Sequence, residues 1–207
     1  MNKYRAIVYS INYLANAGIK TADYMDRTIS GLVRDLYDGD ISKSDFEDSM
    51  SELIEKQFKR AFNEAMKENG SEWTDAIDAK YQERVTNQYQ YIEKFADDIL
   101  AGKDAETGYG QFTSRAELWA NQYDSTVNEA KLITGAKDDR YKWVMGATEE
   151  HCTTCASLDG VVATAEQWEA SGFHPQQPPN DALTCGGWRC DCSLELTDEP
   201  VTEGFFQ

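Results

Sequence analysis

The sequence predicts an α+β protein, with a mostly helical N-terminal region of long antiparallel helices followed by a small α+β module. Apolar residues recur at three- and four-residue steps through the first 136 residues, which is the period of an α-helix. The composition changes after Gly135, because all four prolines, both histidines and all five cysteines lie beyond it. We therefore expect a helical domain or arm over residues 1–136 and a cysteine-rich module over residues 137–207.

Short polar turns divide the first half of the helical region. A first amphipathic helix is expected over residues 4–14, and a second runs from Thr21 to the turn at 38–40. Ser42 and Asp45 have the spacing of a capping pair, in which each residue bonds to the other's backbone. A third helix is therefore predicted to begin just after Ser42.

Long helices are also predicted in the second half of this region. The third helix should end at Asn69-Gly70, and a fourth should begin near Ser71 and stop at Gly102. At 1.5 Å per residue the fourth helix is roughly 45 Å long, which is typical of an antiparallel arm. A fifth helix is predicted to start at the capping box formed by Ser114 and Glu117.

The module after residue 136 has only short periodic segments. Strands are expected over residues 141–145, 161–162 and 193–196, and a brief helix over residues 164–171. A sheet this small cannot build a large core, so a metal staple is physically expected.

The cysteines provide the ligands for such a staple. Cys152 and Cys155 are separated by two residues, a spacing that lets a tight turn aim two thiolates at one tetrahedral ion. The second half of the site must come from Cys185, Cys190 and Cys192, with His174 as the alternate ligand. Cys190 and Cys192 are the first choice, but if the backbone there is extended, Cys185 and Cys190 become the better pair. We expect one structural Zn²⁺ per chain.

Three other interpretations of the cysteines stay open. They could be buried small hydrophobic residues or form disulfides, or they could belong to a thiol–disulfide enzyme, although no βαβ context surrounds the first pair. A catalytic zinc would need an open coordination position and a general base, for which Glu149 and Glu150 are the candidates. No His-Glu-x-x-His sequence is present, so we expect no catalytic residues.

Charge and hydropathy exclude two classes of partner. The net charge of −17 repels phosphate backbones and anionic lipid headgroups, so direct nucleic-acid binding is not expected. No run of residues reaches the roughly 18 to 20 apolar positions that a membrane-spanning helix needs, so no membrane association is expected.

Several motifs together resemble the phage Mu F-type minor head protein family, also called the head morphogenesis family. They are Trp143, Cys152-x-x-Cys155, Leu158-Asp159-Gly160-Val161, Pro178-Pro179, Arg189-Cys190-Asp191-Cys192 and Leu194, preceded by a similar helix over 115–130. The resemblance covers about the last 95 residues. Family members usually carry His-Pro just before the Cys-x-Cys pair, whereas this chain has Gly186-Gly187, so either Cys185 or His174 could replace the missing histidine.

The resemblance implies a structural protein of a tailed phage or prophage, without enzymatic activity. It implies a virion location inside the head near the portal, host cytoplasm during assembly, and contacts with the portal and/or major capsid protein. Two alternatives are a zinc-dependent hydrolase or nuclease-like toxin and a cytosolic zinc-knuckle adaptor. If the helices engage a partner, some of their large aromatic residues should be exposed, the candidates being Phe46, Phe58, Phe62, Trp73 and Phe95.

Overall fold

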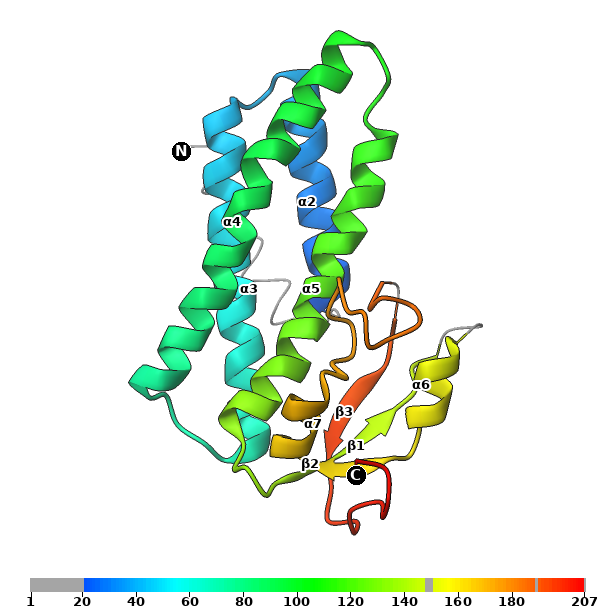
Figure 1. Cartoon of the computed structure of the whole chain (residues 1–207). Coiled ribbons are helices and arrows are strands. Elements are labelled where there is room, and N and C mark those ends of the chain that lie inside the picture. The colour runs from blue at the N-terminus through cyan, green and yellow to red at the C-terminus, as the bar shows by residue number, and fades with distance from the viewer. Residues whose placement is uncertain (1–20, 148–150, 189, 207) are drawn as a thin grey trace. The chain divides into compact units, whose positions relative to one another are not determined.

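In the part of the chain that the structure describes, four long helices precede a small mixed region with a three-stranded antiparallel sheet (Figure 1). The structure, a computed structural model, describes residues 21–147, 151–188 and 190–206, so the helix predicted over residues 4–14 lies outside the described residues. The predicted fold class is confirmed. The elements are α2 (Thr21–Asp38), α3 (Lys43–Asn69), α4 (Asp75–Asp104), α5 (Gly110–Thr134), β1 (Arg140–Val144), α6 (Thr153–Leu158), β2 (Val162–Thr164), α7 (Ala165–Ser171) and β3 (Ser193–Leu196).

The chain divides into two compact units. Among the described residues, unit 1 consists of residues 21–57 and 87–120, and unit 2 consists of the described residues from 58–86 and from 121 onward. Helices α3, α4 and α5 contribute residues to both units, whereas the strands, α6 and α7 all belong to unit 2. The cysteine-rich module is thus part of the same unit as segments of three helices. Among the described helices, none is long and apolar enough to cross a membrane.

Unit 1 has an aromatic core. Phe95 on α4 is fully buried, with Phe46 edge-on at 5.8 Å and Trp119 stacked at 6.4 Å between ring centroids. The Arg115 guanidinium lies 4.5 Å from the centroid of the Phe95 ring and donates to Asp98 at 2.7 Å. Such contacts add to the free energy gained from burying the rings themselves.

The capping pair predicted at the start of α3 is confirmed. The Asp45 backbone N–H donates to the Ser42 hydroxyl at 3.1 Å, and the Ser42 N–H donates to the Asp45 carboxylate at 3.1 Å. Each residue therefore satisfies a backbone donor that the first turn of a helix leaves unpaired.

The predicted starts of the next two helices are wrong. Helix α4 begins at Asp75 with Thr74 as its cap, because the Ser71 N–H is used to close α3 by donating to the Met66 carbonyl at 3.0 Å. Helix α5 begins at Gly110, one turn before the predicted capping box. Phe112 is buried beside Ala116, so the apolar stripe extends upstream of Ser114.

The exposed aromatic residues expected of helices that engage a partner are not found among the four candidate phenylalanines, which counts against such a role for the helices. Phe46 and Phe95 are fully buried in unit 1, and Phe58 and Phe62 are fully buried in unit 2. Trp73 is half-buried and stacks on Phe62 at 6.0 Å between ring centroids. These rings fill the cores of the units. They belong to the apolar faces whose spacing predicted the helices, and each helix packs that face into the core of its unit.

Gly31 in the middle of α2 offers a direct test of helix propensity. A Cβ added there meets no atom within 4 Å, and the residue lies inside an α-helix. We expect Gly31→Ala to raise the free energy of unfolding by about 1 kcal/mol, the difference in helix propensity between the two residues. Urea unfolding followed by circular dichroism measures the change, and a loss of stability would show that the site has no room.

The sheet in unit 2 has the order β2-β1-β3, with both pairs antiparallel. Strand β3 occupies Ser193–Leu196 as predicted, and β1 and β2 lie within two residues of their predicted positions. Tyr141 and Trp143 of β1 are fully buried on one face. Trp168 of α7 covers that face and donates from its indole N–H to the Tyr141 carbonyl at 2.8 Å.

The outer edge of β3 is bonded by side chains from helices of the same unit. The Leu194 N–H donates to Asn128 Oδ1 at 3.0 Å, and the Leu194 carbonyl accepts from Lys131 Nζ at 2.8 Å. Lys131 is itself 8% exposed and pairs with Glu68 at 2.9 Å. An edge strand normally leaves such backbone groups open to other chains, so these bonds both protect the edge and join the sheet to α5.

We expect Lys131→Met to lower the free energy of unfolding by about 2 kcal/mol, because it leaves the buried Leu194 carbonyl without a donor. Lys137→Met is the matched control, since its side chain is 84% exposed in a surface ion pair with Glu166. Hydrogen exchange of the β3 amides reports the effect locally. Equal exchange in the two variants would mean that the Lys131 bond contributes nothing to the edge.

Candidate metal centre

The first two cysteines lie at the start of α6. Cys152 precedes the helix as its N-cap, and its sulfur accepts the Cys155 backbone N–H at 3.3 Å. A thiol in place of the usual Ser or Asp cap turns both sulfurs toward the same side, with Cys155 buried and Cys152 half-buried. This arrangement explains why a two-residue spacing serves a metal knuckle.

Cys185 comes from the loop between α7 and β3, and hydrogen bonds within the loop fix its position. Asn180 is the hub of these bonds: its side chain donates to the carbonyls of Gly172 and His174, and its N–H donates to the Gly186 carbonyl. Thr184 then attaches the loop to α6, because its N–H donates to the Thr154 hydroxyl at 3.1 Å. The loop therefore holds Cys185 beside the first pair.

Cys190 and Cys192 lie in the segment that leads into β3. The sulfur of Cys190 is 3.7 Å from that of Cys155, and Cys192 is buried. Gly146, just after β1, lets this segment approach closely, since a Cβ there would stand 2.0 Å from the Asp191 carbonyl oxygen. Only glycine leaves enough space at this position.

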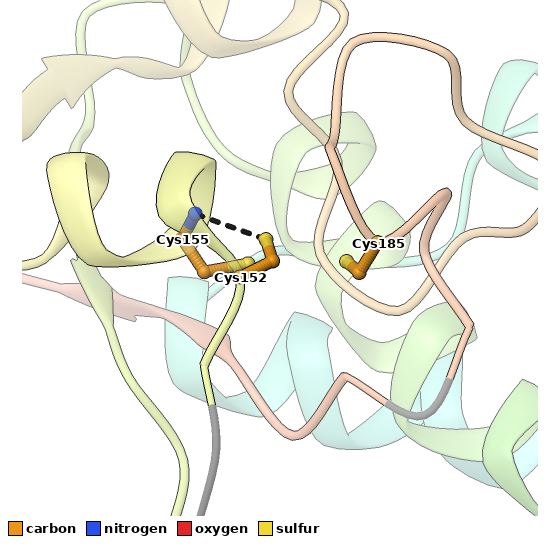
Figure 2. Close-up of side chains that lie close together, drawn as sticks. All are labelled: Cys152, Cys155 and Cys185. Carbon is orange, nitrogen blue, oxygen red and sulfur yellow. Dashed lines mark hydrogen bonds between the residues drawn. The ribbon is translucent and has the colours of Figure 1, made fainter.

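The five sulfurs form two overlapping groups that share Cys155. Cys152, Cys155 and Cys185 form one group, shown in Figure 2, in which all sulfurs lie within 4.8 Å of one another. Cys155, Cys190 and Cys192 form the other group at the same limit. A Zn–S bond of about 2.3 Å in a tetrahedron places sulfurs roughly 3.8 Å apart. The clustered cysteines could therefore hold a metal ion such as zinc.

The environment sets different pKa values for these thiols. Burial raises the pKa of Cys155 and of Cys185, and contact with Cys192 together with burial raises that of Cys190. Burial also disfavours the thiolate of Cys152, but donors from Cys155 and Cys185 outweigh it and lower the pKa of Cys152 to about 7. A metal ion that binds here must therefore displace protons from most of its ligands.

The other residues singled out by the sequence have different positions. Neither group of sulfurs includes His174, whose Nδ1 lies 2.6 Å from Gln177 Oε1. The candidate bases Glu149 and Glu150 lie outside the described residues. Asn180, Thr184 and Gly146 were not predicted to support the site. The Asn residue that follows Pro178-Pro179 is a turn signal that could have indicated the hub, whereas nothing in the sequence indicates the close approach at Gly146.

The reactivity of the thiols tests this description. At pH 7 in metal-free protein, we expect iodoacetamide to modify Cys152 about ten times faster than Cys155 or Cys185. The thiolate is the nucleophile, and the pKa of Cys152 is lower than those of Cys155 and Cys185. Peptide mapping by mass spectrometry over a time course measures the rates, and added Zn²⁺ should slow all of them. Faster labelling at Cys155 would contradict the burial and hydrogen bonding described above.

Comparisons with protein-family profiles, with curated protein sequences and with solved structures gave no match.

Proposed function

We propose that this protein is a minor head protein of a tailed phage or prophage, which acts in head morphogenesis through protein–protein contacts and carries one structural Zn²⁺ in its C-terminal module. The observation that carries the structural-zinc part of the proposal is the donor set, since the candidate ligands gathered from three separate segments are all cysteine sulfurs. Sets of four thiolates are typical of structural zinc sites, which are closed because protein ligands occupy all four coordination positions.

A closed site suits a structural role better than a catalytic one. A catalytic zinc keeps one coordination position for water or substrate and usually has histidine or carboxylate ligands. Here five thiols compete for four positions, so no position needs to be left for water. The zinc would instead join α6, the loop after α7 and the segment before β3, which a small sheet alone cannot hold together.

The module also has a rigid base. Asn128 and Lys131 bond the edge of β3 to α5 of the same unit, and Glu68 pairs with Lys131. A metal-locked surface on such a base keeps its shape, which lowers the entropy lost when a partner binds. We propose the portal and/or the major capsid protein as that partner, inside the head near the portal. Because the phenylalanines of the described helices are buried, the contact must use other side chains.

The phage assignment rests on the motifs around the cysteines and on the acidic surface. A net charge of −17 would keep a protein inside the head from adhering to packaged DNA. The test is co-expression with the portal and capsid proteins encoded beside the gene, followed by purification of the particles and quantitative mass spectrometry. We expect this chain in the particles at a few copies, and fewer in a Cys152→Ser, Cys155→Ser variant.

Two results would overturn the proposal. Neighbouring genes without portal and capsid proteins would favour the cytosolic zinc-knuckle adaptor. Particles that assemble with equal yield and without this chain would remove the role in head morphogenesis. Hydrolytic or nuclease activity lost on neutralising Glu149 or Glu150 would support the enzyme alternative instead.

A further inference from the structure

The centre has one more thiol than a tetrahedral ion can use. We infer that Cys152, Cys155, Cys185 and Cys190 are the four ligands, and that Cys192 does not bind the ion. The inference rests on the proposed structural zinc and specifies its ligands. It also replaces Cys192, the sequence-based first choice, with Cys185.

The first argument is geometric. Cys152, Cys155 and Cys185 already lie within 4.8 Å of one another, so they form three corners of a tetrahedron that needs little contraction. The fourth corner must be close to all three of these sulfurs, and because Cys190 is grouped only with Cys155 and Cys192, it has to move toward Cys152 and Cys185 when the ion binds. Cys190 is 3.7 Å from Cys155, which agrees with the roughly 3.8 Å between sulfurs around one zinc ion.

The second argument is the supply of hydrogen-bond donors. Thiolates bound to zinc keep negative charge, and backbone N–H groups that point at them stabilise that charge. N–H groups of Cys155 and Cys185 reach the sulfur of Cys152, and that of Gly187 reaches Cys185. The backbone N–H groups of Cys192 and Gln176 reach the sulfur of Cys190. The backbone is thus arranged around three of the four inferred ligands.

The third argument is the environment of Cys192. It is 1% exposed and packs in one apolar cluster with Trp143, Trp168 and Leu194. A cysteine that is not a ligand packs there as a small hydrophobic side chain.

The most direct experiment identifies the ligands without any substitution. The full-length protein is loaded with ¹¹³Cd²⁺, and a ¹¹³Cd–¹H correlation spectrum reports which cysteine Hβ protons couple to the metal. We expect one cadmium signal with correlations to Cys152, Cys155, Cys185 and Cys190. Correlations to Cys192 in place of Cys185, or two cadmium signals per chain with Cys155 common to both, would overturn the inference.

Matched variants give a second measurement. We expect Cys185→Ala to lower Zn²⁺ affinity about 100-fold or more, because losing a ligand should cost more affinity than losing a residue that only hydrogen-bonds to a ligand. Cys192→Ala should leave the affinity within about threefold of the wild-type value. Competition with a chromophoric chelator measures both. The reverse order would again overturn the inference. If the wild-type protein binds neither zinc nor cadmium, the proposed structural zinc itself is wrong.

Discussion

The Cys152→Ser, Cys155→Ser variant is expected to lose the fold of the cysteine-rich module. These two thiols belong to the first group of sulfurs, and Cys155 also belongs to the second, so both groups are broken together. Structural zinc sites contribute about 10 to 16 kcal/mol of apparent binding free energy, which is comparable to the whole stability of a small domain. Hydrogen exchange should show amides of β1, β2 and β3 exchanging as in an unfolded chain.

Ala156→Ser is the matched control for this variant. Ala156 follows Cys155 on the same short helix and is exposed. Its replacement by serine introduces a hydroxyl group, as the cysteine substitutions do, but removes no sulfur. Its exchange should equal that of the wild type. A double cysteine variant with protected strands would show that the module is stable without metal.

Gly146→Ala is expected to have the second largest effect. The added Cβ would stand 2.0 Å from the Asp191 carbonyl oxygen and 2.4 Å from its carbon, both backbone atoms that cannot rotate away. The segment that carries Cys190 and Cys192 would have to move. We expect the free energy of unfolding to fall by about 3 kcal/mol or more, the upper range for overpacked sites, and zinc affinity to fall with it.

The control is Gly110→Ala at the start of α5, where an added Cβ meets no atom within 4 Å. Thermal unfolding and chelator competition on both variants make the comparison. Wild-type zinc affinity in Gly146→Ala would mean that this close approach is unimportant for the site.

The sequence predicts elements well where a local signal is unique. The Ser42–Asp45 pair is one such signal, because both bonds form within four residues. The strands of the module were also predicted, and β3 has the bounds expected for it. Runs of β-branched and aromatic residues between turn signals contain enough information for short strands.

The misplaced helix starts show where local signals compete. Ser71 and Ser114 both have the residue type of an N-cap, but Ser71 closes the helix before it and Ser114 lies inside a helix that Phe112 extends. Tertiary burial decided the second case, and sequence alone does not give it. The burial of Phe46, Phe58, Phe62 and Phe95 was not decided by the sequence for a related reason, since an apolar stripe does not show whether it packs against the same chain or against a partner.

The candidate site was predictable in its residue types and not in its geometry. The two-residue spacing of Cys152 and Cys155 indicated a metal knuckle, because its ligands are adjacent in the chain. The second half depends on a loop whose conformation is set by bonds from Asn180 to Gly172 and His174 and by the bond from Thr184 to Thr154. Long-range hydrogen bonds of this kind leave no periodic pattern in a sequence.

Metal content per chain tests the central claim most directly. Protein purified without chelators should contain close to one zinc ion per chain by inductively coupled plasma mass spectrometry, and this zinc should be absent from the Cys152→Ser, Cys155→Ser variant. That result would establish the cysteine cluster as a zinc site. A chain that is folded, free of metal and unchanged on adding Zn²⁺ would contradict the claim, and the cluster would then be a group of buried thiols.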